Sequence, residues 1–366
     1  MSKIFRAIGL MSGTSLDGID LALIETDGGD YIKLLNFDYL PYSDDFQNNI
    51  REVIFNPSSL HKIKLLEYEI TKFHIQIVKN FLADNHIKSA DIDVIGFHGQ
   101  TIYHNPALQV SWQLGNSTLL AKETSIKVVG DLRLNDIAEG GQGAPLVPIY
   151  HYYLFKNIAN PLMILNIGGV SNYTFIDKDL TNLRAADLCF GNAPFNDLMF
   201  SKFNLPFDKD GDLANQGKII NEEVDKILHH PIFNQLPPRS FSRNDFDDAL
   251  KSINDHEASN ILATYCEIFA LLLQKEITQI IKKIPQKIII CGGGSYNKTL
   301  VSAIKNKLNN IEILTANQIN YNNDSIEAEA FAFLAVRNLL RLPISFPNTT
   351  ATKNSAGSLG GVLYHF

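Results

Sequence analysis

The feature that most constrains this fold is a repeated unit: an apolar run, a loop rich in glycine and hydroxyl residues, and a second apolar run. The first copy reads FRAIGLMSGTSLDGID (residues 5–20) and the second reads PLMILNIGGVSNYTFID (residues 161–177). Apolar runs flanking a tight turn indicate β-hairpins. Gly13 and Gly168 are separated by about the length of one domain. This spacing predicts a duplicated fold with a cleft between its halves, although such hairpins also occur singly in unrelated folds.

Segments typical of strands alternate with segments typical of helices along the chain, which predicts an α/β fold. Apolar residues recur at helical spacing in four stretches, and we expect helices over residues 60–85, 256–284, 298–308 and 325–341. We expect strands over residues 4–10, 19–24, 31–39, 93–97 and 287–291, and two more within 161–177. The crossings between domains are expected where glycine and proline are dense, near residues 140–148 and 341–347.

Composition narrows the class of protein. The 366 residues are 45% hydrophobic and carry 32 basic and 39 acidic side chains, a net charge of −7. Interspersed charges with a negative sum argue against nucleic acid or an anionic membrane as the main partner. The three cysteines form no CxxC pair, which favours a reducing cytoplasm. No window approaches the length of about 18 apolar residues that a membrane span needs.

The opening loop has the composition of an anion-binding site. Glycines allow backbone N–H groups to approach an anion closely, and Ser or Thr hydroxyls add further donors for phosphate oxygens. Asp17 and Asp20 are candidate Mg²⁺ ligands, because hard oxygen ligands suit that ion. The alternative is a plain hairpin turn in which Asp-Gly supplies a positive φ. The loop is not a Walker A motif, since it lacks the Gly-Lys-Ser/Thr ending.

Two further glycine clusters follow strand-like runs. Gly168 and Gly169 offer the same kind of backbone donors as the opening loop. The turn CGGGSYN (residues 291–297) follows the apolar run KIIIC and precedes a helix, and a helix N-terminus favours an anion. Neither cluster matches the GxGxxG fingerprint, which argues against NAD. A lone glycine triplet is more often a simple turn, but three such loops after strands favour a nucleotide site.

The candidate acid–base and ion-pairing residues lie near expected strand ends. Asp187 is a candidate base, with a turn-capping surface aspartate as the alternative. Arg133, near Asp131, is expected to bind a carboxylate or phosphate through its fork of donors, with an interdomain salt bridge as the alternative. Glu327 lies on an apolar helix, where an acid is costly unless it is paired or used, and we expect Glu329 to face solvent. His98 is a candidate ligand or a structural hydrogen-bonding residue, and no histidine has the spacing of a zinc site.

Several segments resemble the anhydro-N-acetylmuramic acid kinase family. GLMSGTSLDGID, FHGQT, VVGDLRLNDIAEGGQGAPLVP, NIGGVSN and CGGGSYN occur in the family's order, and PPRSFSRNDF and IEAEAFAFLA look like two further family segments. The resemblance implies the superfamily of actin, heat-shock ATPases and sugar kinases, with two duplicated ribonuclease H-like α/β domains flanking a central ATP cleft. It implies ATP and Mg²⁺ as cofactors and usually a homodimer. With the crossings named above, we expect domains at residues 1–140 plus about 342–366 and at 141–341.

The resemblance also assigns roles. It implies hydrolytic opening of the 1,6-anhydro bridge of a muramic acid sugar with phosphorylation of its 6-oxygen, a step of peptidoglycan recycling. Asp187 matches the catalytic aspartate. Residues expected on the sugar side are Arg133, Glu327, His98 and Gln100. Residues expected around ATP are Gly13, Thr14, Ser15, Leu16, Asp17, Gly18, Ile19, Asp20, Gly168, Gly169, Gly292, Gly293 and Gly294.

The chain departs from the family pattern at three places. LCFGN follows Asp187 where TGPGN is usual, Leu132 stands for the phenylalanine of GDFR, and the C-terminal TTATKNSAGSLGGVLY replaces a TGA-containing segment. We expect these changes to alter the walls of the sugar pocket, with Phe190 narrowing it. The alternatives are therefore a kinase for another 1,6-anhydro sugar, such as levoglucosan, and a non-sugar ATPase switch.

Overall fold

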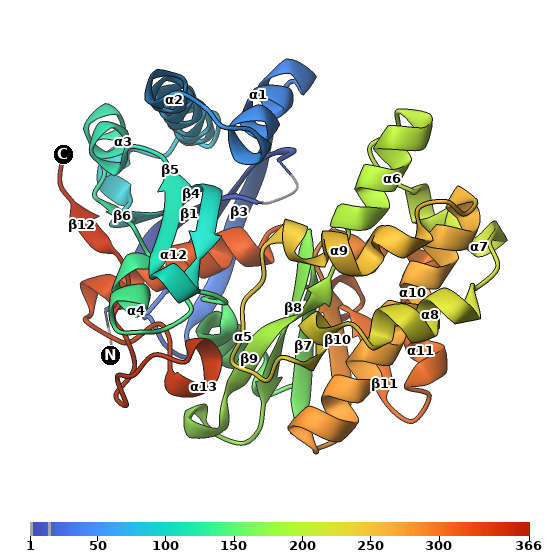
Figure 1. Cartoon of the computed structure of the whole chain (residues 1–366). Helices are drawn as coiled ribbons and strands as arrows, with labels where there is room; N and C mark the ends of the chain where they lie inside the picture. Colours follow the sequence, from blue (N-terminus) through green and yellow to red (C-terminus); the bar gives the residue numbers. More distant parts are fainter. Residues whose placement is uncertain (1–2, 14–15) are drawn as a thin grey trace. The chain divides into compact units, whose positions relative to one another are not determined.

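The computed structural model describes residues 3–13 and 16–366, and the chain divides into two compact units (Figure 1). Unit 1 comprises residues 1–154 and 325–366, and unit 2 comprises residues 155–324. The boundaries expected from glycine and proline density lay at 140/141 and 341/342. They differ because the two intervening segments pack within unit 1, where Tyr150 donates a hydrogen bond to Glu329 across 2.6 Å.

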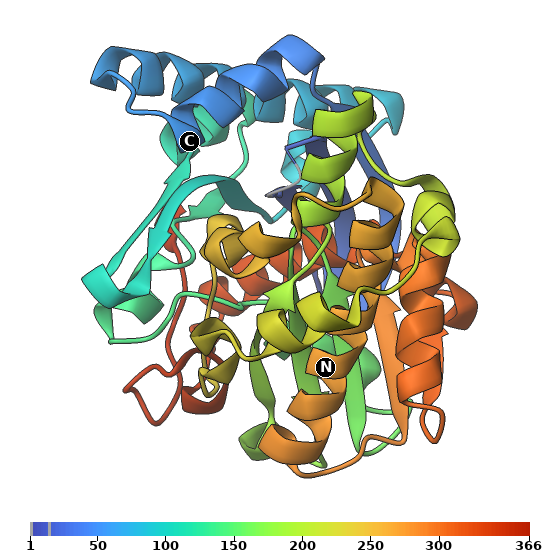
Figure 2. The ribbon, with the colours of Figure 1, turned by 45° about the vertical axis from the view of Figure 1, so that its right-hand side comes forward.

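Unit 1 is built on a mixed sheet in the order β12-β6-β4-β1-β2-β3, with β5 paired to β4. Its strands are β1 (Phe5–Ser12), β2 (Gly18–Thr26), β3 (Ile32–Pro41), β4 (Val94–Asn105), β5 (Val110–Leu114), β6 (Val128–Gly130) and β12 (Val362–Tyr364). Its helices are α1 (Asp44–Phe55), α2 (Leu60–Asp84), α3 (Ser117–Thr124), α4 (Leu134–Ala138), α5 (Pro148–Phe155), α12 (Ile326–Leu339) and α13 (Pro347–Thr350). In Figure 2 the blue helices α1 and α2 run side by side.

Unit 2 is built on a sheet in the order β11-β10-β7-β8-β9. Its strands are β7 (Leu162–Ile167), β8 (Val170–Ile176), β9 (Arg184–Phe190), β10 (Lys287–Cys291) and β11 (Glu312–Thr315). Its helices are α6 (Ala193–Phe203), α7 (Asp212–Gln216), α8 (Asn221–Leu228), α9 (Asp247–Leu250), α10 (Ala258–Lys275) and α11 (Lys298–Lys307). A π-helix, Glu276–Ile281, continues α10, so the long helix expected over 256–284 changes its hydrogen-bond pattern at Glu276.

The two sheets repeat one topology. The five strands β3-β2-β1-β4-β6 of unit 1 correspond in order to β9-β8-β7-β10-β11 of unit 2. In each set the first three strands form an antiparallel meander, and the next two run parallel to the central strand. The hairpins β1–β2 and β7–β8 occupy equivalent places and carry the two glycine-rich loops. The expected duplicated α/β fold is therefore confirmed.

Close helix packing in unit 1 depends on two glycines. A Cβ atom on Gly9 of β1 would lie 1.8 Å from the carbonyl oxygen of Ala328, and one on Gly96 of β4 would lie 2.0 Å from that of Phe331. Both distances are far below van der Waals contact, so only glycine allows α12 to lie directly on the sheet. This contact fixes the first turns of α12, which carry Glu327 and Glu329.

Candidate functional site

The candidate residues of unit 1 gather at the carboxyl ends of its parallel strands. The opening loop follows β1, His98 and Gln100 lie near the middle of β4, and Arg133 follows β6. We expected the strand over 93–97 to end before His98, but β4 continues to Asn105, because Ser12 pairs with Gln100 and β5 pairs with the extension. In open α/β sheets this edge is where ligands bind.

The side chain of Gln100 is hydrogen-bonded to the start of the opening loop. The hydroxyl of Ser12 donates to Oε1 of Gln100 at 2.6 Å, and Nε2 of Gln100 donates to the carbonyl of Gly13 at 3.2 Å. On the other side of the loop, the backbone N–H of Tyr42 donates to the carbonyl of Asp17 at 2.8 Å. Gln100 is fully buried. Its contacts in the structure therefore give it a loop-supporting role, in addition to the expected place near the sugar.

The other residues expected around ATP in this loop differ in what they expose. Thr14 and Ser15 lie outside the described residues. Leu16 and Ile19 are buried in the core of unit 1, so their side chains serve packing. Asp17 is exposed and Asp20 is half-buried in β2, opposite Met11. A Cβ atom on Gly18 would lie 2.4 Å from the carbonyl of Leu40, which explains that glycine by close strand packing.

Arg133 and His98 form the polar centre of unit 1. Nε and Nη2 of Arg133 both donate to Nε2 of His98, at 3.1 and 2.9 Å, and Nη1 donates to the carbonyl of Gly143 at 2.7 Å. Nδ1 of His98 lies 2.7 Å from the carbonyl of Gly99 and must donate to it, so Nε2 is the acceptor. Burial and the neighbouring Arg133 cation hold the pKa of His98 well below its usual range. His98 is therefore neutral and presents Arg133 as a half-buried cation.

A second histidine shares this environment. Nδ1 of His104, on the β4 extension, lies 2.9 Å from the hydroxyl of Ser111 on β5. Burial, followed by the charge of Arg133, lowers the pKa of His104 to about 3. The sequence pattern did not single out His104, although it stands six residues after His98 in the same strand.

The two glutamates of α12 differ from expectation, because Glu329 is more deeply buried than Glu327. Glu329 was expected to face solvent, but it is 4% exposed and accepts hydrogen bonds from the hydroxyls of Tyr150 and Ser325. Burial raises the pKa of Glu329 above its ordinary value. Glu327 is only half-buried, at the first turn of the helix. The ring of Phe331, one turn further on, lies 4.7 Å from that of His98, so this end of α12 is on the side of the Arg133 centre.

The glycine clusters of unit 2 come together at the carboxyl ends of β7 and β10. The N–H groups of Gly191 and Asn192, which begin the turn into α6, donate to the carbonyls of Gly169 and Gly168 at 2.9 and 2.7 Å. A Cβ atom on Gly191 would lie 2.1 Å from the carbonyl of Gly168. The turn after β9 is therefore docked directly on the second glycine-rich hairpin.

The glycine triplet joins the same cluster. Gly292 has φ +76, and a Cβ atom there would lie 2.4 Å from Oδ1 of Asn166. A Cβ atom on Gly294 would lie 2.2 Å from a methyl carbon of Ile167, whereas Gly293 is exposed. Only glycine lets β7 and the turn after β10 approach this closely. The expected grouping of Gly168–Gly169 with Gly292–Gly294 is a feature of unit 2.

Asp187 lies inside β9 and opposite Asn172 of β8, and it is 6% exposed. Its backbone N–H donates to the carbonyl of Arg239 at 3.0 Å, and its Oδ2 accepts from the backbone N–H of Phe241 at 2.7 Å. The surface-cap alternative is therefore wrong. The segment PPRSFSRNDF, which the sequence pattern left without a role, covers the β9 edge of the sheet and fixes this carboxylate.

Two residues that differ from the family pattern, Phe190 and Leu132, are buried in the hydrophobic interior of their units. Phe190 is fully buried, and its ring centre lies 5.6–6.4 Å from those of four other aromatic residues of unit 2. Leu132 is 2% exposed and packs against the C-terminal segment at Gly361. That segment in turn donates from the Thr350 hydroxyl to buried Asp136 at 2.6 Å. The expectation that Phe190 narrows a ligand pocket is wrong, because its side chain fills the hydrophobic core.

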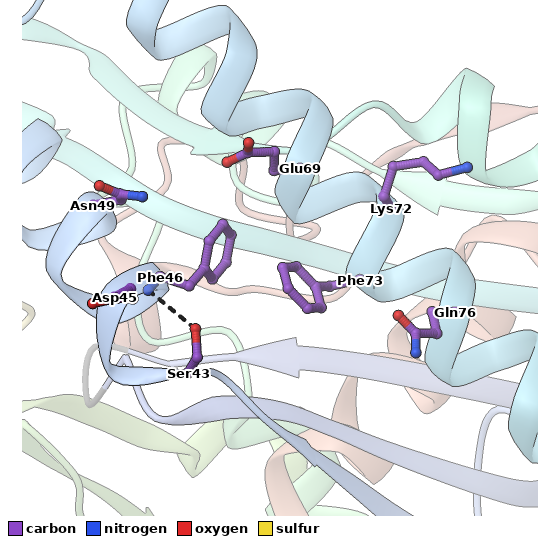
Figure 3. Close-up of a pocket in the computed structure, with 8 residues that line it drawn as sticks. All are labelled: Ser43, Asp45, Phe46, Asn49, Glu69, Lys72, Phe73 and Gln76. Carbon is purple, nitrogen blue, oxygen red and sulfur yellow. Dashed lines mark hydrogen bonds between the residues drawn. The ribbon is translucent and has the colours of Figure 1, made fainter.

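Each unit also has a groove between its helices. One of about 450 Å³ in unit 2 lies between α7, α10 and α11, and it begins at Lys298 and Thr299, just after the glycine triplet. The other, of about 430 Å³, lies between α1 and α2 of unit 1, with Phe46 and Phe73 as its aromatic floor (Figure 3). Neither is lined by a residue that we expected in the site. No helix among the described residues has the length and apolar character needed to cross a membrane.

A repeated five-stranded sheet with a glycine-rich hairpin at the same place in each copy defines the class of actin-like and sugar-kinase-like α/β proteins. The profile of the anhydro-N-acetylmuramic acid kinase family matches residues 5–365, and the chain belongs to that family. Proteins named anhydro-N-acetylmuramic acid kinase from Zymomonas mobilis and Nitrobacter winogradskyi are 40% and 39% identical over 94% of this chain and 96% and 95% of their own. A solved dehydratase activator from Clostridium difficile aligns over 92% of this chain and 96% of its own, with 11% identity and a TM-score of 0.49.

Proposed function

We propose that the chain is an ATP-dependent kinase that opens 1,6-anhydro-N-acetylmuramic acid and yields N-acetylmuramic acid 6-phosphate. The observation that carries the proposal is Asp187: a buried carboxylate with one oxygen fixed by a backbone N–H, in a chain that belongs to this kinase family. Such a carboxylate is suited to accept a proton at a defined place, because its rotamer is held before the substrate arrives.

The reaction balances with one base. Water attacks the anomeric carbon and loses a proton to Asp187, while the bond between that carbon and the bridging oxygen breaks. The bridging oxygen, now the 6-oxygen of the sugar, forms a bond to the γ-phosphorus as ADP leaves. A positioned base contributes about 10²–10⁴-fold to such a step. Phosphoryl transfer itself depends mainly on alignment and neutralisation of charge.

Arg133 is proposed to bind the lactyl carboxylate of the sugar. Glu327, His98 and Gln100 are proposed to lie on the sugar side of the site. Two contacts support the role of Arg133: neutral His98 orients the guanidinium, and the Gly143 carbonyl holds it from the other side. A cation presented in this way fits a planar carboxylate better than a flexible lysine does. A plain hexose lacks that carboxylate, so the same contacts favour a muramic acid over levoglucosan or glucose.

The glycine loops are proposed to hold ATP. The backbone of residues 13–20 and of Gly168–Gly169 would meet the phosphates, and Gly292–Gly294 would meet the nucleoside, next to the groove between α7, α10 and α11. The described residues include no cluster of three metal-ligating side chains. Mg²⁺ is usually held by one or two carboxylates plus substrate phosphates, so Asp17 and Asp20 fit an ion that is carried in with the nucleotide.

Family membership also motivates proposals that concern the whole protein. We infer a cytoplasmic homodimer that acts in peptidoglycan recycling.

The decisive experiment measures ADP release with four sugars: 1,6-anhydro-N-acetylmuramic acid, levoglucosan, N-acetylmuramic acid and glucose. We expect release to require the 1,6-anhydro muramic sugar, and the product to carry one phosphate on its 6-oxygen by NMR. A higher kcat/KM for levoglucosan would assign the chain to another anhydro sugar. ADP release that is indifferent to all four sugars would point to an ATPase switch instead.

A further inference from the structure

The segment that carries Arg239 is bound to Asp187 twice. The carbonyl of Arg239 accepts from the N–H of Asp187, and two residues later the N–H of Phe241 donates to the Asp187 carboxylate. The segment is therefore hydrogen-bonded to β9, which is the last strand in the order of its sheet, without being a strand of that sheet itself. A displacement of this segment along β9 would move the Phe241 N–H away from Oδ2 of Asp187.

The side chain of Arg239 fastens the segment to the interior of unit 2. Arg239 is buried, with 7% of the residue exposed. Nη2 of its guanidinium donates to Oε2 of Glu276 at 2.8 Å. The same guanidinium donates to the carbonyls of Gln235 and Leu188, at 3.1 and 3.5 Å. The hydroxyl of Tyr173 donates to the other oxygen of Glu276 at 2.7 Å.

The three linked side chains, Arg239, Glu276 and Tyr173, come from different segments of unit 2. Glu276 is the first residue of the π-helix, and Tyr173 lies on β8 opposite Ala186, next to the pair that contains Asp187. Burial, followed by the Glu276 carboxylate, raises the pKa of Tyr173 well above its usual range, so its hydroxyl remains a donor. A buried ion pair of this kind adds little stability compared with apolar residues of the same size. Its more specific use is to hold a backbone in one register.

We propose that Arg239, anchored by Glu276 and Tyr173, is a positioning residue for the carboxylate of Asp187. The proposal rests on the proposed role of Asp187 as the base. Removal of the guanidinium frees the 239–241 segment, so the Phe241 N–H no longer holds Oδ2 in the orientation that receives the proton. Arg239 itself touches neither substrate nor nucleotide in this account.

The test separates positioning from stability by means of a paired variant. Arg239→Met alone leaves Glu276 buried and unpaired and is expected to lower Tm. Arg239→Met/Glu276→Leu removes both charges and is expected to recover Tm. We expect kcat of the double variant to stay lower than wild type by about 10–100-fold, because misplacement by about 1 Å costs that much. KM for ATP should change less than about twofold, and Arg239→Lys should recover part of kcat.

A matched control lies on the same strand. Arg184 of β9 is exposed, and its Nη1 donates to the carbonyl of Ile281, in the same π-helix, at 3.5 Å. Arg184→Ala should keep wild-type kcat. Recovery of both Tm and kcat in the Arg239→Met/Glu276→Leu variant would overturn the inference. That result is distinct from failure of the proposed function, which would appear as an Asp187→Asn enzyme that retains turnover.

Discussion

Units 1 and 2 share a sheet but differ in what they place at its carboxyl edge. Unit 1 has a cation, Arg133, held by the neutral ring of His98. Unit 2 has mainly backbone groups there, from three glycine-bearing turns in contact with one another. It adds one carboxylate, Asp187, which accepts a hydrogen bond from the N–H of Phe241. Unit 2 also contains a buried ion pair, Arg239–Glu276. The same sheet therefore presents a side-chain cation at this edge in unit 1 and backbone turns with a carboxylate in unit 2.

The cores differ in the same way. In unit 1, α12 lies on a glycine pair, Gly9 and Gly96, which are hydrogen-bonded neighbours in β1 and β4. In unit 2 the equivalent strands, β7 and β10, carry bulky aliphatic residues such as Ile164 and Ile289. The duplication preserves the order of the strands, while side-chain size decides how near a helix can come. At these paired positions unit 1 is therefore sensitive to added volume and unit 2 to lost volume.

The largest expected effect concerns the carboxylate that only unit 2 provides. Asp187→Asn keeps the shape of the side chain and removes the base. We expect kcat to fall by at least about 10²–10⁴-fold, because proton transfer from water loses its acceptor. Binding of ATP, measured by calorimetry without sugar, should remain near wild type. A variant that binds ATP and retains more than a tenth of wild-type kcat would remove Asp187 from the mechanism.

The second effect is acid sensitivity, which should be confined to unit 1. Burial lowers the pKa of four histidines there: His74 to about 4, His104 and His151 to about 3, and His98 well below its usual range. Unfolded histidines titrate near pH 6.5, so below that pH the unfolded state binds more protons than the folded state. The stability of unit 1 should therefore fall between pH 6.5 and about 4, by up to about 1.4 kcal/mol per pH unit for each histidine.

The chain supplies a separate probe for each unit. Trp112, the single tryptophan, lies on β5 of unit 1. The three cysteines, Cys189, Cys266 and Cys291, are free and buried in unit 2, where none of the histidines is buried. As pH is lowered, we expect the urea midpoint followed by Trp112 emission to fall before the midpoint followed by thiol labelling. Midpoints that fall together at every pH would contradict a difference between the units.

The sequence was a good guide wherever a local rule decides the structure. Apolar runs and helical spacing predicted the long helices and seven of the strands, but not β5, β6, β9, β11 or β12. Glycine-rich turns after apolar runs predicted which loops carry the candidate site. Those loops gather because strands in a repeated sheet end at one edge. The hairpin resemblance also predicted the duplication, since β1–β2 and β7–β8 occupy equivalent positions.

The errors arise where long-range packing decides. Glu327 and Glu329 are two residues apart on an apolar helix, and nothing local shows that Tyr150, far earlier in the chain, donates to Glu329. Phe190 follows Asp187 closely and looked like a pocket residue, but side chains of a strand alternate between faces, and its face is the core. The pairing of Arg239 with Glu276 could not be predicted from the sequence for the same reason, because Glu276 comes from a helix distant in the sequence.

A third prediction tests the difference in core packing by volume. Gly9→Ala adds one methyl group where Ala328 leaves no room, and we expect a loss of about 1–3 kcal/mol in the free energy of unfolding. Ile164→Val in the equivalent strand of unit 2 removes one methyl group and should cost about 0.5–1.5 kcal/mol. Gly29→Ala is the control, because a Cβ atom there meets nothing nearer than 3.4 Å. The comparison fails if urea unfolding shows Gly9→Ala to be as mild as Gly29→Ala.

The smallest effect concerns Glu329, a buried carboxyl of unit 1 whose pKa is raised by burial. A carboxyl whose pKa is higher in the folded than in the unfolded state stabilises the fold most when it is protonated. Ionisation of Glu329 should therefore lower the free energy of unfolding as the pH rises above the pKa of an unfolded glutamate, about 4.3. Glu329→Gln removes this cost but weakens the bonds from Tyr150 and Ser325, and we expect a net change within about 1 kcal/mol. Relative to wild type, the variant should therefore gain stability from pH 5 to pH 8 in thermal unfolding. A difference that is constant with pH would mean that Glu329 stays in one protonation state over this range, with its two hydroxyl donors setting the balance.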